Sequence, residues 1–188
     1  MVYPLIFGRR WRRPVILFTF VTILFGGGLH ARVYVETKQA LAEAFPDATL
    51  LERKALYLTK AQQADLTQES GLEKIGRFHT FYVARKNNAV LGYALFDTHV
   101  VRTKEETVLI ALNADGSVRA VRMISFFEPQ EYLAPERWLA IFTGKTGADT
   151  LRPGSDLPTI SGATLTTRAI STAVRKAVQL YRIHFAGA

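Results

Sequence analysis

The segment of residues 77–128 most constrains the fold, because its apolar residues recur with a period of two. Within it, "RFHTFYVARKNNAVLGYALFDTHVV" suits two strands around "KNNA", and "ETVLIALNADGSVRAVRMISFFE" suits two more around "NADGS". Such alternation is typical of strands that bury one face, and an Asp-Gly pair favours a tight hairpin turn. The sequence therefore predicts an antiparallel meander of about four strands.

Helical patterns flank this meander. "ETKQALAEAF" predicts a helix from Glu36 to about Ala44, residues 49–60 suit a strand followed by a turn, and "AQQADLTQESG" predicts a second helix. "PERWLAIFTGK" predicts a short helix, and residues 164–184 predict a long one. Since antiparallel strands and helices share one chain, the predicted fold class is α+β, an antiparallel β-sheet packed with helices. One apolar stripe runs along the last helix at the spacing i, i+3, i+4, i+7: Ile170, Ala173, Val174, Ala177, Val178 and Tyr181.

The positive charge of the chain is concentrated at its N-terminus. Residues 1–35 hold five of the 24 Lys and Arg and none of the 16 acids, so the body keeps 19 basic residues against 16 acids. The body has no long basic stripe interleaved with aromatic residues, and we expect no nucleic-acid partner. The chain has no Cys, which excludes disulfides, thiolate metal sites and iron–sulfur clusters, and we predict no metal site.

An apolar run from Val15 to Leu29 follows four Arg. Its 15 residues span about 22 Å as a helix, against roughly 30 Å of hydrocarbon, and the helix reaches further if it continues to Val35. We expect a transmembrane helix that anchors the chain in the inner membrane with a single pass. The Arg-rich leader then lies in the cytoplasm and the body in the periplasm. A cleaved signal peptide and a buried core helix are the competing interpretations. The predicted domains are residues 1–35 and 36–188.

Hydroxyl side chains crowd the start of the last predicted helix, in "TISGATLTTRAISTAVRKAV" at residues 159–178. The first N–H groups of that helix and the positive end of its dipole face the "SGAT" turn, which suits a phosphate. Gly162 permits close approach of a ligand, and Ala163 adds little bulk. Ordinary capping of the helix by Ser or Thr is the simpler interpretation of the residues alone, and a reactive or modified Thr is a third.

The motif "SGATLTT" resembles the flavinylation motif of FMN-binding domains, which occur in FMN-carrying subunits of the Rnf complex and of the sodium-pumping NADH:quinone reductase. The resemblance covers most of residues 32–185, including "FPDA", "VLGYALFD", "NADGSVRAVRM" and "EPQEYLAPERWLAIFTGK". It implies that a flavin transferase takes FMN from FAD and links the FMN phosphate to the hydroxyl of Thr164. It also implies a phosphate site made by the surrounding residues and their backbone N–H groups: Ser161, Gly162, Ala163, Leu165 and Thr166.

The same resemblance points to a second segment, "FFEPQEY", which approaches the isoalloxazine in related domains. Glu128 and Tyr132 are therefore candidate flavin contacts, with plain core packing as the alternative for the aromatic residues. Arg102 is a candidate partner for the flavin phosphate or for a carboxylate of another protein. We expect His99 to be an ordinary strand or surface residue and Trp138 to be a core residue.

One position departs from the family pattern. Many members carry an Asp three residues before the Ser of the motif, whereas this chain has Pro158 there and its nearest acid is Asp156. If that Asp helps the flavin transferase to recognise its target, modification is weaker in this chain unless a shifted loop lets Asp156 substitute.

The function that the resemblance implies is that of an anchored flavoprotein, an electron-transfer subunit rather than a stand-alone enzyme. It would relay electrons between membrane or periplasmic redox proteins through FMN and would need no catalytic side chain. The alternative is a non-catalytic anchored assembly or sensory module with the same fold and no flavin. Reversible FMN binding without the ester is a third possibility.

Overall fold

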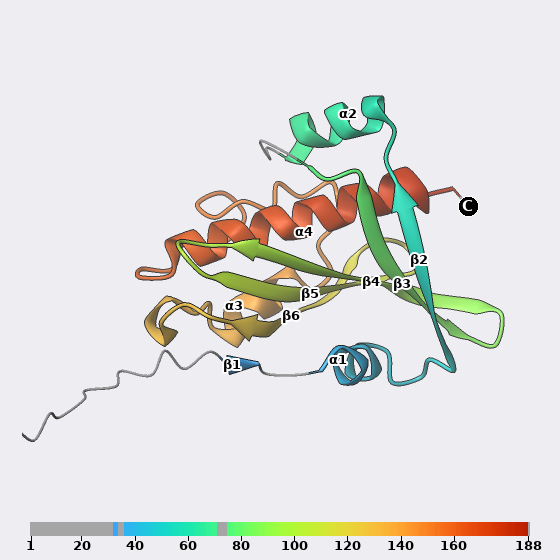
Figure 1. The fold of residues 1–188 in the computed structure, drawn as a ribbon, viewed down its shortest axis with the longest axis horizontal. Helices are drawn as coiled ribbons and strands as arrows, with labels where there is room; N and C mark the ends of the chain where they lie inside the picture. Colours follow the sequence, from blue (N-terminus) through green and yellow to red (C-terminus); the bar gives the residue numbers. More distant parts are fainter. Residues whose placement is uncertain (1–31, 34–35, 71–74, 188) are drawn as a thin grey trace, which may run out of the picture.

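The fold is one antiparallel sheet with helices on both faces, in a computed structural model that describes residues 32–33, 36–70 and 75–187 (Figure 1). The sheet order is β1-β6-β5-β4-β3-β2. Its strands are β1 (Arg32–Val33), β2 (Leu50–Tyr57), β3 (Phe78–Lys86), β4 (Ala89–Val100), β5 (Glu105–Asn113) and β6 (Val118–Phe126). The helices are α1 (Thr37–Ala44), α2 (Lys60–Ser70), α3 (Glu136–Leu139) and α4 (Thr164–His184), with 3₁₀ turns η1 (Gln130–Tyr132) and η2 (Ala140–Phe142).

The predicted meander is confirmed, since β3 to β6 are neighbours in chain order and the strand predicted within residues 49–60 joins them as β2. The hairpin between β3 and β4 turns through Asn87, whose φ of 54° lies in the left-handed region. The hairpin between β5 and β6 turns at Asp115 and Gly116, and Gly116 has a φ of 85°. The "NN" and "DG" pairs of the sequence thus supply the conformations that these turns need.

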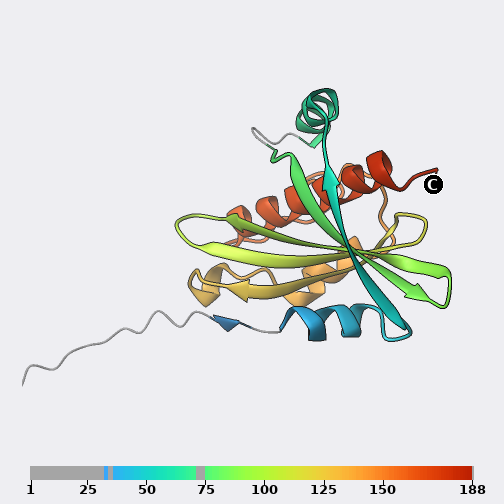
Figure 2. The ribbon, with the colours of Figure 1, turned by 45° about the vertical axis from the view of Figure 1, so that its right-hand side comes forward.

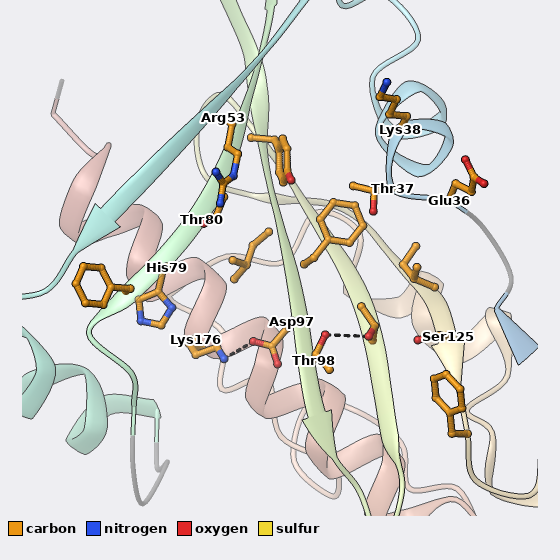
Figure 3. A pocket seen from close by; sticks show the side chains of 17 residues that line it. Glu36, Thr37, Lys38, Arg53, His79, Thr80, Asp97, Thr98, Ser125 and Lys176 are labelled. Carbon is orange, nitrogen blue, oxygen red and sulfur yellow. Dashed lines mark hydrogen bonds and ion pairs between the residues drawn. The ribbon is translucent and has the colours of Figure 1, made fainter. Parts of the chain in front are cut away.

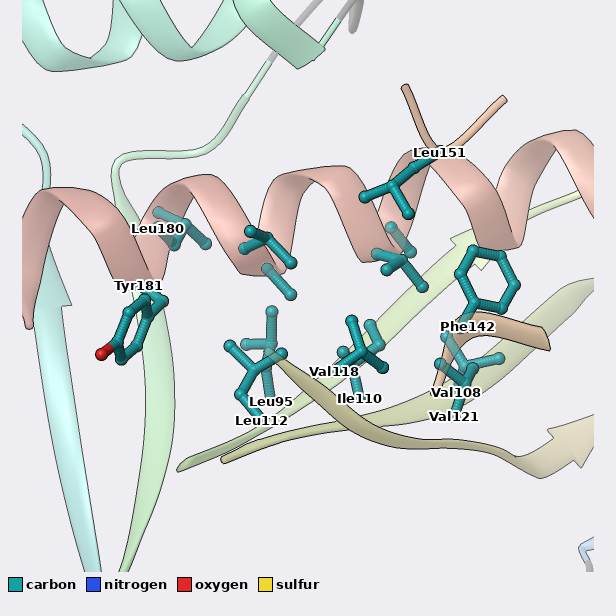
Figure 4. Close-up of a cluster of buried hydrophobic side chains, with 14 of the residues drawn as sticks. Leu95, Val108, Ile110, Leu112, Val118, Val121, Phe142, Leu151, Leu180 and Tyr181 are labelled. Carbon is teal, nitrogen blue, oxygen red and sulfur yellow. The ribbon is translucent and has the colours of Figure 1, made fainter. Parts of the chain in front are cut away.

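The two faces of the sheet bury different sets of side chains, as the period-two pattern requires. In β5, Val108, Ile110 and Leu112 belong to the core under α4, whereas Leu109 and Ala111 belong to the core under α1. Figure 4 shows the larger core between the sheet and α4, and Figure 2 shows α1 on the opposite side. Each fully buried Val, Leu or Ile among them stabilises the fold by about 1.5–3 kcal/mol.

The long C-terminal helix has the predicted bounds, and its predicted apolar stripe is buried against the sheet. The segment from Pro135 to Phe142 packs into the same core. Trp138 is 1% exposed and meets the ring of Phe142 edge to face at 5.2 Å. This arrangement places the start of α4 at one end of the sheet, next to η1 and to the turn between β4 and β5.

A continuation of the apolar N-terminal helix to Val35 is the condition for a longer span, and Arg32 and Val33 do not meet that condition. These two residues form β1, because their backbone pairs with Phe126 and Ser125 on the open edge of β6. The apolar run from Val15 to Leu29 and its Arg-rich leader lie outside the described residues. Among the residues that the structure does describe, no helix combines the length and apolarity needed to cross a bilayer.

Candidate functional site

The N-terminus of α4 is open, as the phosphate hypothesis requires. The helix begins at Thr164, and its N-cap residue Ala163 has no side chain that can cap it. The first N–H bonded within the helix is that of Thr167, which donates to the C=O of Ala163 at 2.9 Å. The N–H groups of Thr164, Leu165 and Thr166 precede that bond, at the positive end of the dipole. In the described part of the chain, no hydroxyl of the motif caps this helix, so ordinary capping does not explain the motif.

The hydroxyls on the first two turns of α4 divide into buried ones and that of Thr164, which is only partly buried. Thr167 and Ser171 are fully buried and donate to carbonyls one turn back, at 3.1 and 2.7 Å. Thr164 is only partly buried, and its Oγ1 donates to the C=O of Ile160 at 3.2 Å, which is long for a hydroxyl. Thr164 therefore presents a weakly bonded hydroxyl at the mouth of the helix.

Gly162 shapes the turn before the helix through its backbone. Its φ of 86° lies in the left-handed region, which favours glycine. A Cβ at this position would lie 3.6 Å from the carbonyl oxygen of Glu131, an ordinary contact, so conformation rather than space requires glycine. Ser161 and Gly162 are exposed while Ala163 is buried. The turn thus leaves its backbone accessible to a ligand.

Three distant segments meet at this turn. The hydroxyl of Thr166 is buried and donates to the carbonyl of Tyr132 at 2.7 Å, which joins η1 to the first turn of α4. The guanidinium of Arg102, on the turn after β4, lies 4.3 Å from the ring centre of Tyr132. The structure therefore brings Tyr132 and Arg102 to the predicted site. The side chain of Thr166 is engaged by the protein, and only its N–H can serve a ligand.

Glu128 holds a neighbouring turn. The residue is 5% exposed, and its Oε1 accepts hydrogen bonds from the N–H groups of Thr103 and Lys104 at 2.7 and 2.8 Å. The N–H of Thr103 above all lowers the pKa of Glu128. Glu128 braces the turn that carries Arg102, and its role as a direct flavin contact stays a prediction.

The loop before the motif is pinned at Pro158. The indole Nε1 of Trp138 donates to the carbonyl of Pro158 at 2.8 Å. Asp156 accepts hydrogen bonds from the N–H groups of Leu151 and Arg152 and from Lys145. Burial raises the pKa of Asp156, but these bonds and one from a Thr hydroxyl outweigh burial and hold that pKa well below its ordinary value. The carboxylate of Asp156 is thus committed to its own loop.

These features fit a phosphate ester. Unbonded N–H groups, an accessible glycine backbone and the partly buried hydroxyl of Thr164 converge at the turn. Arg102 and Arg168 are both exposed, and Arg168 follows Thr164 by one helical turn on the same face. Both guanidinium groups match the charge and geometry of a phosphate. Across the described ranges, no group of three or more His, Asp or Glu is placed to hold a metal ion.

Sequence analysis missed a buried charge cluster between β4, β5 and α4. Nδ1 of His99 lies 2.8 Å from Asp97 Oδ1, and Nε2 lies 2.6 Å from Glu106 Oε1. The other oxygen of Asp97 pairs with Lys176 of α4. His99 is a strand residue as predicted, but its ring bridges two buried carboxylates. The alternation of side chains along β4 could have revealed the cluster, because Asp97 and His99 point to the same side of the sheet as the buried Leu95.

We predict that this cluster makes stability fall at alkaline pH. Burial lowers the pKa of His99, but its hydrogen bonds to Asp97 and Glu106 outweigh burial and raise that pKa from 6.5 to about 9. A raised pKa stabilises the folded state fully below pH 6.5, and the stabilisation is lost as pH rises through 9. The free energy of unfolding, measured by urea titration, should fall by up to about 3 kcal/mol over this window. The His99→Gln variant should show a flatter profile, and parallel profiles would contradict the prediction.

Comparison with known proteins shows a similarity to FMN-binding domains. Residues 103–179 match the model of the FMN-binding domain. A relative from Acetobacterium woodii, which is one component of the Na(+)-translocating ferredoxin:NAD(+) oxidoreductase complex, is 27% identical over 128 residues. That alignment covers 62% of this chain and 62% of the relative, so the chain matches less than two thirds of the relative's length.

The crystal structure of Shewanella oneidensis NqrC has a similar fold, with a TM-score of 0.53 and 11% sequence identity. The match covers 79% of this chain and 87% of that chain. The matched segment of the family model contains the turn residues Thr103 and Lys104, η1 and the first turn of α4, which belong to the segments that meet at the candidate site. The resemblance drawn from the sequence is confirmed: residues 103–179 match the FMN-binding domain family, and FMN is the cofactor that the comparisons indicate.

Proposed function

We propose that the chain is a membrane-anchored periplasmic flavoprotein that carries FMN as a phosphoester on Thr164 and relays electrons between redox proteins. The observation that carries this proposal is the open N-terminus of α4, with the hydroxyl of Thr164 at its mouth and Arg102 and Arg168 nearby. The FMN-binding domain match and the similarity to a component of a redox complex support it.

Attachment would change the bonding of one side chain. A flavin transferase would join Thr164 Oγ1 to the phosphorus of FMN, break the P–O–P bond of FAD and release AMP. The hydroxyl proton leaves in this step, so Thr164 gives up its hydrogen bond to Ile160. The product carries one negative charge, which a helix N-terminus stabilises by about 0.3–1 kcal/mol. The N–H groups of Leu165 and Thr166 would hold the phosphate oxygens.

Bound FMN supplies the electron-transfer chemistry, and the protein supplies position and electrostatics. Tyr132 would contact the flavin, and the Arg102 guanidinium over its ring would place a positive charge beside it. Glu128 keeps Arg102 in place through the N–H groups of Thr103 and Lys104. The residues before 36 would hold the domain at the inner membrane, close to membrane or periplasmic redox partners.

Intact-mass measurement tests the proposal. The full chain, produced with and without a flavin transferase, should differ by the mass of FMN less one water, and peptide mapping should place the adduct on Thr164. A non-catalytic module with the same fold would show no adduct under either condition. Reversible FMN binding would give a yellow protein that loses its colour on denaturation.

A further inference from the structure

Glu106 is a buried carboxylate with one oxygen unused. Its side chain is 0% exposed; Oε1 bonds to His99, and Oε2 has no hydrogen-bond partner within the described part of the chain. A buried carboxylate in this state is costly when ionised, and a proton would remove the cost. Burial raises the pKa of Glu106, and its bond to His99 offsets this only in part.

The cluster lies where the sheet splits. β3 pairs with β4 only from Phe81 opposite Leu95 onward, so the strand beyond Leu95 pairs with β5 alone. A cleft of about 1040 Å³ opens between the separated strands, and Figure 3 shows Asp97 and Lys176 joined within it. A second cleft of about 430 Å³ lies between β4 and α4 and is lined by His99, Asp97 and Lys176. Water can therefore reach His99, whereas Glu106 lies behind it.

The second cleft runs along α4 toward the proposed attachment site. Arg168, Thr172 and Lys176 line it, and they follow Thr164 in steps of four residues on one helix face. At 1.5 Å per residue, Thr172 lies about 12 Å along the axis from Thr164. From the other side, the turn that starts two residues after His99 carries Arg102 to Tyr132. The charge cluster and the proposed flavin site are thus neighbours.

We infer that Glu106 is the proton acceptor that compensates the charge of an electron on the FMN, receiving a proton through His99 on reduction and releasing it on reoxidation. This inference rests on the proposed function. The electron comes from a redox protein and the proton from solvent. The imidazolium of His99 passes its Nε2 proton to Oε1 of Glu106, which leaves a neutral ring that still carries its proton on Nδ1. The ring then turns its bare Nε2 toward the clefts and takes up a proton from solvent there, so that the pair gains one proton in all.

Electrostatics sets the size of the coupling. A unit negative charge at about 12 Å, the axial separation of Thr164 and Thr172, and at an effective dielectric constant of about 20, raises the proton affinity of a carboxylate about tenfold. By linkage, protonation of Glu106 makes reduction easier by the same factor. Other charged and titratable groups also act on Glu106 and His99. They are Asp97 on β4, Lys176 and Arg168 on α4, His79 on β3 and Glu128 after β6.

The test uses the full chain, produced with a flavin transferase and purified in detergent, as wild type, Glu106→Gln and Glu105→Gln. Glu105 is the exposed neighbour of Glu106 and serves as the matched control. Infrared difference spectra, reduced minus oxidised, should show a protonated carboxyl band in the wild type and in Glu105→Gln but not in Glu106→Gln. Proton uptake per electron, from potentiometric titration over roughly pH 6 to 8, should fall only in Glu106→Gln.

Each outcome of this test either supports or overturns the role of Glu106. A band that persists in Glu106→Gln, or a flavin-loaded wild type without a band, overturns the inference and leaves the proposed function standing. A wild-type protein that carries no flavin after production with the flavin transferase contradicts both the inference and the proposed function. If Glu106→Gln does not fold, Glu106→Asp replaces it: a shifted band supports the inference, and an unshifted band assigns the proton to another group.

Discussion

The Thr164→Ala variant is expected to carry no covalent flavin at all, while keeping its fold. Thr164 contributes one hydroxyl bond, 3.2 Å long, to the carbonyl of Ile160, and the side chain is partly exposed. Its removal should cost less than about 1 kcal/mol of stability, because ordinary intramolecular hydrogen bonds contribute about that much. The nucleophilic oxygen is lost completely, so flavinylation should fall from full occupancy to the detection limit. Denaturing gels viewed under ultraviolet light measure this directly.

Thr172 provides a matched control for that experiment. It lies on the same face of α4 two turns later, and its hydroxyl donates to the carbonyl of Arg168 at 2.9 Å, in the same geometry as Thr164. Thr172→Ala should remain fluorescent on the gel. Thr164→Ser keeps a hydroxyl at the right place and should retain part of the signal. Fluorescence that survives in Thr164→Ala would move the attachment to another residue and defeat the proposal.

Much of the fold could be predicted because its signals are local. The period-two runs, the "NADGS" turn and the stripe of α4 each depend on residues close in sequence. The start of α4 near Thr164 could also be predicted, because the apolar stripe from Ile170 onward and the "SGAT" turn before it together place the first helical turn there. The two-residue strand β1 could not, because it depends on the open edge of β6, far along the chain at Ser125 and Phe126.

Long-range geometry also decided the parts of the site that sequence analysis missed. No local pattern predicts that Thr166 donates to Tyr132, that Arg102 lies over the ring of Tyr132, or that Glu128 braces the preceding turn. The family resemblance named Glu128 and Tyr132 as a pair of flavin contacts. In the structure both residues act on Arg102. Glu128 accepts hydrogen bonds from the turn that carries Arg102, and the ring of Tyr132 lies under its guanidinium.

Replacing Trp138 by Ala should produce the largest loss of stability in the region that carries the motif. The indole is 1% exposed, contacts Phe142 edge to face at 5.2 Å and donates to the carbonyl of Pro158 at 2.8 Å. Truncating a buried Trp costs about 3–5 kcal/mol, against a typical total stability of about 5–15 kcal/mol. Urea unfolding of the full chain in detergent, followed by circular dichroism, measures the loss.

Two further variants separate the packing of Trp138 from its hydrogen bond. Trp138→Phe keeps most of the ring contact but loses the bond to Pro158, so it should cost clearly less than Trp138→Ala and loosen residues 158–163. Ile141, nearby on η2, is 37% exposed, and Ile141→Ala should change stability far less than Trp138→Ala. If the Pro158 bond positions the motif for the flavin transferase, Trp138→Phe should be folded yet poorly flavinylated. Full flavinylation of that variant would show that the core alone places Thr164, without help from the indole N–H.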